Sequence, residues 1–192
     1  MTQSYQMKKT AILYCLLLAT TFTIKAQSVY FTKNGLISFY SQTPLENIEA
    51  KNNDVASKFN TQSGDLEIQL LIKGFQFKKA AMQEHFNEKD YMDSDNFPKS
   101  IYKGKITDIS KVDFKKNGTY PVSTEGDLTL HGVTNKIKTT GTMVVNGESV
   151  TINAAFTIKL EDYKVKVPAI VSKKVAETVT IKIDCIYQLY KS

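Results

Sequence analysis

The sequence predicts an all-β protein in which eight antiparallel strands close into a barrel and a short α-helix caps one end. Two observations predict the strands: long runs in which apolar and polar residues alternate, and three Asn-Gly dipeptides between such runs. Alternation places every second side chain on the same face of a strand. Asn-Gly favours the type I′ turn of a hairpin, because both central residues of that turn need a positive φ. The 192 residues suffice for one domain with a sizeable core.

Residues 1–26 have the pattern of a secretory signal peptide. Lys8 and Lys9 precede an apolar run at 11–18, and Ala26 offers a small residue for cleavage. The run is too short for the roughly 20 residues of a membrane-spanning helix. Cleavage leaves a mature domain, residues 27–192, and removes three lysines without any acidic residue, so the formal net charge falls from +6 to +3. We therefore expect an exported protein, periplasmic or secreted.

The basic composition does not indicate a nucleic-acid partner. All 25 basic residues are lysine, and none is arginine. Arginine supplies the planar, bidentate contacts that phosphate and base recognition use most. The lack of arginine, together with the small charge of the mature chain, predicts no nucleic-acid binding.

The expected strands follow one another along the mature chain. The clearest alternates six apolar residues with polar ones, from Val150 to Leu160, and the last strand repeats the pattern. We expect strands at 29–33, 36–40, 66–77, 101–109, 119–130, 136–145, 150–161 and 179–189. Hairpin turns are expected at Asn34-Gly35, Asn117-Gly118 and Asn146-Gly147. A closed eight-stranded barrel has no free edges, and its interior is either filled by side chains or holds one slender ligand.

Two segments depart from the strand pattern. Met82 and Phe86 lie four residues apart within 78–90, which predicts a short amphipathic helix over one mouth of the barrel. Segment 44–63 is rich in Asn, Ser and charged residues, so we expect a long loop or short helix there. Cys185 is the one cysteine left after cleavage, and its apolar neighbours predict a buried, unreactive side chain.

The sequence shows no motif of a known catalytic centre. It has no Gly-x-Ser-x-Gly elbow, no phosphate-binding loop and no dinucleotide fingerprint. His131 precedes a glycine and suits a turn. His85 lies between Glu84 and Glu88, without the second histidine of a helical zinc motif. We therefore expect no catalytic residue, no metal and no cofactor.

Three blocks of the sequence form a recognisable pattern. The first comprises Phe75-x-Phe77, Met82-Gln83-Glu84-His85-Phe86, Tyr91-Met92-Asp93-Ser94-Asp95-Asn96-Phe97-Pro98 and Ile101-x-x-Gly104-x-Ile106. The second comprises Gly118-x-Tyr120-x-Val122 and, from Gly126, the run Leu-Thr-Leu-His-Gly-Val-Thr at 128–134. The third joins Phe156-x-Ile158-x-Leu160-Glu161-Asp162-Tyr163 to Ile181-x-Ile183. In this order and over nearly the whole mature chain, the blocks resemble the YceI family of exported, lipocalin-like lipid-binding proteins.

The resemblance implies an antiparallel barrel closed by a helix around an apolar channel. The ligand would be a polyisoprenoid of quinone or polyprenyl type, or a similar long-chain amphiphile, held for transport or storage without catalysis. On this chain, lipid contact is expected at Phe75, Phe77, Met82, Phe86, Phe97, Leu128, Leu130, Ile152, Ala154 and Phe156. At the mouth, a head group would face His85, Lys78 and Lys79.

Two other functions stay open at this point. A structural or stress-related module would fill its barrel with bulky side chains, whereas Gly126, Gly141 and Ala154 favour room inside. An enzyme centred on His85 and Glu84 is the third hypothesis. For a lipid carrier we also consider transient contact with a membrane and a homodimer.

Overall fold

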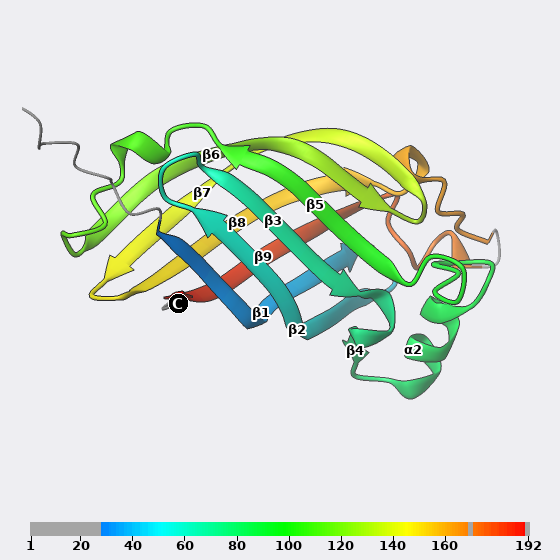
Figure 1. The fold of residues 1–192 in the computed structure, drawn as a ribbon. Coiled ribbons are helices and arrows are strands. Elements are labelled where there is room, and N and C mark those ends of the chain that lie inside the picture. Colours follow the sequence, from blue (N-terminus) through cyan, green and yellow to red (C-terminus); the bar gives the residue numbers. More distant parts are fainter. Residues whose placement is uncertain (1–27, 169–170, 191–192) are drawn as a thin grey trace, which may run out of the picture.

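The computed structural model describes residues 28–168 and 171–190, which form a closed antiparallel β-barrel (Figure 1). Hydrogen-bonded neighbours follow the order β1-β9-β8-β7-β6-β5-β3-β2, and β1 pairs with β2 to close the barrel. The strands are β1 Val29–Gln42, β2 Asn47–Asn60, β3 Asp65–Leu71, β5 Lys99–Ile106, β6 Gly118–Leu130, β7 Val133–Asn146, β8 Ser149–Lys159 and β9 Thr178–Leu189. A ninth strand, β4 (Gln76–Phe77), adds to the edge of β2. The predicted eight-stranded barrel is confirmed.

The expected signal peptide, residues 1–26, lies outside the described residues. Among the residues that the structure describes, no helix has both the length and the apolar character needed to cross a membrane.

β1 is one continuous strand where the sequence predicts two. Asn34-Gly35 forms a β-bulge rather than a hairpin turn, because the pairing of β1 with both neighbours shifts register there. The bulge reverses the inward face, so that Tyr30 is buried before it and Ile37 after it. A Cβ at Gly35 would lie 2.5 Å from the Sγ of Cys185. The glycine therefore serves close packing here, and the hairpin prediction at this dipeptide is wrong.

β2 occupies the segment predicted as a loop or short helix, and that prediction is wrong. Two of its inward side chains are small and polar, which hides the alternation. Asn52 is 0% exposed; its Nδ2 donates to the carbonyl of Leu71 and its Oδ1 accepts from the backbone N–H of Asp54, both at 2.9 Å. Ser57 donates to the carbonyl of Glu67 at 2.8 Å. Buried polar groups with partners can replace apolar ones in a strand.

Two predicted strands end earlier than expected. The segment 66–77 is divided by a 3-10 turn, η1 (Ile72–Gly74), between β3 and β4, and the segment 101–109 reaches a 3-10 turn, η2 (Ile109–Lys111), after β5. A Cβ at Gly74 would lie 2.6 Å from the Nδ2 of Asn52. The chain thus turns tightly around a buried amide where the apolar pattern alone suggests continued strand.

The hairpin turns are only partly those predicted. Asn146-Gly147 does mark a hairpin, but its central residues are Gly147 and Glu148, and only the glycine has a positive φ, which is the type II′ pattern. Asn117-Gly118 lies at the start of β6 and makes no hairpin turn. The type I′ turn is His131-Gly132 between β6 and β7, with φ values of 49° and 73°. His131 is therefore a turn residue, as predicted.

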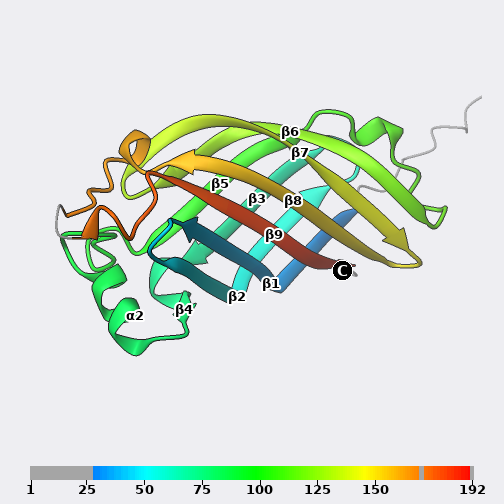
Figure 2. The same ribbon diagram turned by 180° about the vertical axis from the view of Figure 1, so that it is seen from behind.

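The predicted capping helix is confirmed as α2 (Ala80–Asn87). It lies with β4 at one end of the barrel, and the connection between β8 and β9 lies at the same end, as the front and rear views agree (Figures 1 and 2). This end also carries the turn between β6 and β7. The opposite end carries the turn between β7 and β8 and the end of β9 (Figure 2).

The half of the barrel remote from α2 is filled by side chains. Tyr30 stacks on Phe59 with ring centroids 5.2 Å apart, and Phe114, from the β5–β6 connection, stacks on Tyr30 at 5.8 Å. Tyr187 meets Phe59 edge-on at 5.1 Å. The other fully buried side chains of this half are Val55, Ile106, Met143, Val145, Val150 and Cys185. These residues belong to one hydrophobic core that continues into the helix-capped half through residues such as Leu70 and Ile158.

The small residues of the mid-barrel strands do not leave open space. A Cβ at Gly126 would lie 2.5 Å from the carbonyl oxygen of Lys103, and one at Gly141 would lie 3.0 Å from the Cβ of Ala154. These glycines allow neighbouring backbones to approach closely where the sheet bends. The expectation of room inside, as drawn from Gly126, Gly141 and Ala154, is therefore wrong for these positions.

Candidate functional site

The helix-capped half of the barrel contains a cavity of about 430 Å³ that is open to solvent on one side. This volume falls within the range of roughly 300–1,000 Å³ typical of small-molecule sites. The strands contribute inward side chains: Ile37, Phe39, Leu70, Leu128, Leu130, Ile158 and Ile181. The capping elements contribute Phe75, Phe77, Met82 and Phe86, and the connection between β8 and β9 contributes Val165, Val167, Val171 and Val175. The lining is thus almost wholly apolar.

Four phenylalanines join α2 to the barrel and form one wall of the cavity. Phe86 of α2 stacks on Phe39 of β1 with centroids 5.5 Å apart, and contacts Phe77 at 5.0 Å and Phe75 at 5.8 Å. Aromatic pairs at these separations contribute about 0.5–1.5 kcal/mol each beyond their buried area. The same rings therefore seat the helix and present apolar surface to the cavity.

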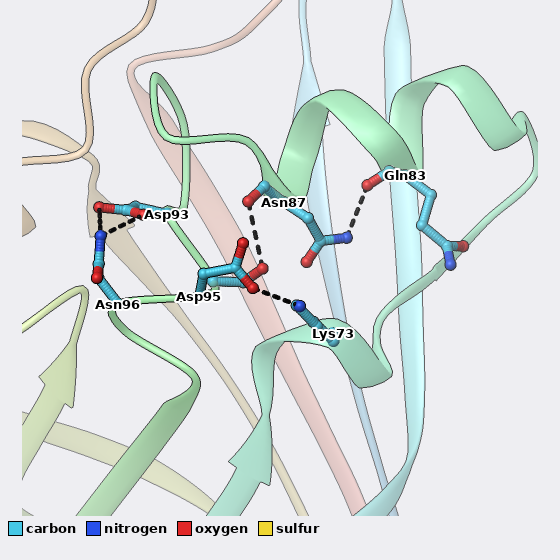
Figure 3. A network of polar contacts seen from close by, with 7 residues as sticks. Lys73, Gln83, Asn87, Asp93, Asp95 and Asn96 are labelled. Carbon is cyan, nitrogen blue, oxygen red and sulfur yellow. Dashed lines mark hydrogen bonds and ion pairs between the residues drawn. The ribbon is translucent and has the colours of Figure 1, made fainter.

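The loop after α2 holds the helix in place through polar contacts (Figure 3). Asn87 Nδ2 donates to the carbonyl of Gln83 at 2.7 Å, and the buried Ser94 donates to the carbonyl of Asn87 at 3.2 Å. Lys73 of η1 pairs with Asp95 at 2.6 Å, as Figure 3 shows. The block Tyr91–Pro98 is therefore mainly a clamp that fixes the capping helix over the cavity.

Six of the ten predicted lipid-contact residues line the cavity: Phe75, Phe77, Met82, Phe86, Leu128 and Leu130. The other four lie elsewhere. Phe97 packs edge-on against His131 at 4.5 Å and stands over Gly132, so it supports the β6–β7 turn. Ile152 is buried in the filled half, and Ala154 and Phe156 lie between the two halves on β8. Lipid contact at all ten positions stays a prediction.

Of the three predicted head-group residues, one borders the cavity and two do not. His85 borders the cavity, whereas Lys79 pairs with Glu46 at 3.0 Å on the outside of the mouth. Lys78 lies next to it, at the end of β4. Glu46 itself borders the cavity, so Lys79 offsets its negative charge there.

Lys166 and Lys174 also border the cavity, and neither is among the residues predicted from the sequence. They belong to a basic strap, which we define as residues 164–168 and 171–176. The strap combines exposed lysines with valines that face the cavity; the two types alternate at 164–167, and the strap contains no acidic residue. Ala176 N–H donates to Ser41 Oγ at 2.8 Å and fixes its end to β1. The Lys-Val alternation in the sequence was the signal that would have indicated this wall.

His85 pairs with Glu88 and not with Glu84, the partner that the enzyme hypothesis names. Its Nδ1 lies 3.1 Å from Oε1 of Glu88, and its side chain is 61% exposed. Among the described residues, no group of three or more His, Cys, Asp or Glu side chains converges as a metal site would require. The arrangement can bury apolar surface and offers a few polar and cationic groups at its edge.

A second depression of about 570 Å³ lies on the outside of β1, β9, β8 and β7. Its lining includes outward side chains such as Tyr40, Asn153 and Asp184, and Lys182 Nζ stands 4.5 Å from the centroid of the Tyr40 ring. This groove mixes charged and polar groups with short apolar ones. The inner cavity is the better candidate site, because its lining is continuous and apolar.

Comparison with solved structures supports the fold. A polyisoprenoid binding domain from Saccharophagus degradans, implicated in plant cell wall breakdown, aligns with a TM-score of 0.74 at 10% identity, over 85% of this chain and 99% of that one. Burkholderia cenocepacia BcnA aligns at 0.66 and 18% identity, over 79% and 95% of the two chains. The Campylobacter jejuni YCEI protein aligns at 0.59 and 13% identity, over 92% and 96%.

No curated protein matches the chain. A family model described as the YceI-like domain matches residues 20–187. The matched segment contains the barrel, the capping helix and the cavity, and it spans most of the 192 residues. The chain therefore belongs to the YceI-like family.

Proposed function

We propose that the protein binds the apolar chain of an isoprenoid or similar long-chain amphiphile in the cavity beneath α2, for transport or storage and without covalent chemistry. The observation that carries the proposal is the apolar lining formed by Phe39, Phe86, Leu128 and Ile158 together with the valines of the basic strap. Burial of each CH₂ group is worth about 0.8 kcal/mol, so such a site needs little polar machinery for affinity.

The family relationship supports this class of ligand. The aligned Saccharophagus domain is described as polyisoprenoid binding, and it shares the barrel architecture over nearly its whole length. Isoprenoid chains are apolar and flexible, which suits a cavity walled by aromatic rings and branched side chains. A quinone or polyprenyl head group would remain at the mouth, near His85 and the strap lysines.

Export forms the second part of the proposal, since residues 1–26 have the pattern of a secretory signal. The protein would then work outside the cytoplasm, where a long-chain lipid needs a shielded route between membranes. The test is the intact mass of the protein after expression with its native leader. A mass that corresponds to a chain beginning at Gln27 supports export, and the mass of the uncleaved chain contradicts it.

Mass spectrometry of bound lipid tests the ligand. The full chain is expressed with its own leader and purified without detergent, and its organic extract is analysed beside that of delipidated protein. We expect about one isoprenoid, quinone or other amphiphile per chain. A clean extract, from a protein that also takes up no added polyprenyl lipid, overturns the proposal.

Two variants on adjacent positions of β8 make the test specific to the cavity. Ile158→Trp fills the cavity, because Ile158 faces inward and lines it. Thr157→Trp adds the same group to the exposed outer face and serves as the matched control. We expect the amount of lipid bound per chain to fall at least tenfold in Ile158→Trp and to stay at the wild-type level in Thr157→Trp.

The filled half of the barrel favours one alternative, a structural module without ligand. That module predicts a clean extract and equal stability with or without added lipid. The enzyme hypothesis centred on His85 and Glu84 gains nothing from the geometry, because His85 pairs with Glu88. Lipid content and folding that are unchanged in His85→Ala would remove it.

A further inference from the structure

The cavity ends partway along the barrel, and the register of the strands shows where. On four strands, inward-facing residues line the cavity only up to a certain position. The next inward-facing residue, two positions further from α2, does not line it, and together these residues form the floor layer of the cavity. The floor layer consists of Ile68 on β3, Tyr102 on β5, Phe156 on β8 and Ile183 on β9. Beyond it lie the fully buried residues of the filled half.

Tyr102 is an aromatic member of this layer, and its surroundings are defined by its strand pairing and by two glycines. It pairs with Leu128, whose side chain lines the cavity, and its ring extends away from the cavity over two glycines. A Cβ at Gly104 would lie 2.6 Å from Cζ of Tyr102, and a Cβ at Gly126 would lie 2.9 Å from the same atom. The side chain of Tyr102 is only 7% exposed. The two glycines thus leave a space that the phenol ring occupies.

The geometry points to Tyr102 as the residue that sets the length of apolar chain the cavity encloses. This inference rests on the proposed function and adds a size limit to its ligand. At about 30 Å³ per non-hydrogen atom, a cavity of about 430 Å³ holds on the order of fifteen such atoms, or roughly three isoprene units. Further units of a longer chain extend past the mouth, beside Lys166 and Lys174.

Removal of the ring should lengthen the cavity. In Tyr102→Ala, the space over Gly104 and Gly126 becomes continuous with the cavity beside Leu128. A long chain can then enter further, and its additional carbons become buried instead of remaining in water. Tyr102→Phe keeps the ring and should retain the wild-type limit.

Prenyl alcohols of increasing length provide the probe, and their dissociation constants are measured by competition with a fluorescent fatty amphiphile. For the delipidated wild-type protein, we expect affinity to rise from geraniol to farnesol and to change less than threefold from farnesol to geranylgeraniol. For Tyr102→Ala, we expect geranylgeraniol to bind at least tenfold more tightly than farnesol. Equal length dependence in wild type, Tyr102→Phe and a folded Tyr102→Ala overturns the inference.

Two further variants keep the test decisive. Met143→Ala removes a fully buried side chain from the filled half, away from the cavity, and should leave the length dependence unchanged. If Tyr102→Ala fails to fold, Leu128→Phe serves instead, because it adds volume beside Tyr102 and should move the preference from farnesol to geraniol. An unchanged preference in folded Leu128→Phe overturns the inference. If the wild type binds no alcohol of any length, the proposed function itself fails.

Discussion

The hydroxyl groups of Ser57 and Tyr187 lie 2.8 Å apart inside the filled half of the barrel, although 130 positions separate the two residues in the sequence. Ser57 donates to the carbonyl of Glu67, so the Tyr187 hydroxyl donates to Ser57 Oγ. This contact links β2 to β9 across the interior. It also gives the buried Tyr187 hydroxyl an acceptor, while Ser57 bonds to both Tyr187 and Glu67.

Removal of either hydroxyl should destabilise the protein. We expect Ser57→Ala to lower the free energy of unfolding by about 1–3 kcal/mol, because the buried Tyr187 hydroxyl loses its acceptor. Tyr187→Phe should cost about 0.5–1.5 kcal/mol, because Ser57 keeps its hydrogen bond to the carbonyl of Glu67. The double variant should lose less than the sum of the two, with a coupling energy of about 1 kcal/mol. Urea unfolding of all four proteins measures the cycle, and strictly additive losses would contradict the contact.

Alkaline pH should weaken the fold through Cys185 and Tyr187. Burial raises the pKa of the Cys185 thiol to about 11 and moves the pKa of Tyr187 well above its usual value. The unfolded chain releases these protons at about pH 8.5 and 10, while the folded chain retains them, so stability is complete below these values and falls as the pH rises above them. Each group contributes a slope of up to about 1.4 kcal/mol per pH unit.

Unfolding free energies between pH 7 and 11 check this slope. Cys185→Ala should flatten the curve between about pH 8.5 and 11, and Tyr187→Phe should flatten it above about pH 10. The thiol of the folded protein should also resist alkylation at pH 8 and react after denaturation. A curve that is identical in all three proteins would contradict the assignment.

Gly35 should not tolerate alanine while Cys185 is present. The added Cβ would lie 2.5 Å from the Cys185 Sγ and 3.3 Å from the carbonyl oxygen of Val55. Overpacking of this kind costs about 1–3 kcal/mol. We expect Cys185→Ala to restore part of the stability lost in Gly35→Ala, as measured by thermal or urea unfolding. The absence of any rescue would place the strain in the backbone rather than at the sulfur.

The His131-Gly132 turn should respond differently at its two positions. Gly132 has a φ of 73° and stands under Phe97, so Gly132→Ala should cost about 1–3 kcal/mol. His131→Asn preserves a residue suited to positive φ and should be tolerated within about 1 kcal/mol, although it removes the contact to the carbonyl of Tyr163. Unfolding curves decide the matter, and equal losses at both positions would contradict the turn geometry.

The strap lysines should favour an anionic head group. Lys166 and Lys174 border the cavity, whereas Lys173 is exposed and does not. We expect Lys166→Ala/Lys174→Ala to weaken binding of a long-chain fatty acid about three- to tenfold, with little effect on the alcohol of the same length, since each exposed charge contributes up to about 1 kcal/mol. The effect should shrink at high salt. Lys173→Ala is the control, and an equal loss for acid and alcohol would contradict a charge effect.

The strands with strong apolar alternation could be predicted from the sequence, and β2 could not. On β8 and β9 the inward side chains are large and apolar, so the pattern alone reveals them. On β2 the inward Asn52 and Ser57 depend on the carbonyls of Leu71 and Glu67, which are brought there only by the closed barrel. A polar residue acquires its buried role from partners that the local sequence does not contain.

The candidate site was predictable in its helical part and less so elsewhere. The predicted helix contains Met82 and Phe86, and Phe75 and Phe77 lie just before it. The structure places all four side chains on the cavity. Ile152 and Ile158 face inward on the same strand, but they lie six positions apart along it. Only Ile158 lines the cavity, and the position at which the cavity ends on β8 depends on the stagger of all the strands, which one strand's sequence does not contain. The strap lies in a long connection; the Lys-Val alternation at 164–167 indicates an apolar face, but it does not determine where the connection crosses the barrel.

The uneven filling of the barrel gives its two halves different roles in exchange with solvent. Amides beside Phe59 and Tyr187 are shielded by a packed core, and their protons should exchange only when the whole domain unfolds. The segments of α2 and the strap pack against a cavity and not against a filled core, so they can open locally at a smaller free-energy cost, and their amide protons should exchange faster. Under the proposed function, a bound chain would leave through a local opening while the rest of the barrel stays folded. Its residence time would then be set by the mouth and not by global stability.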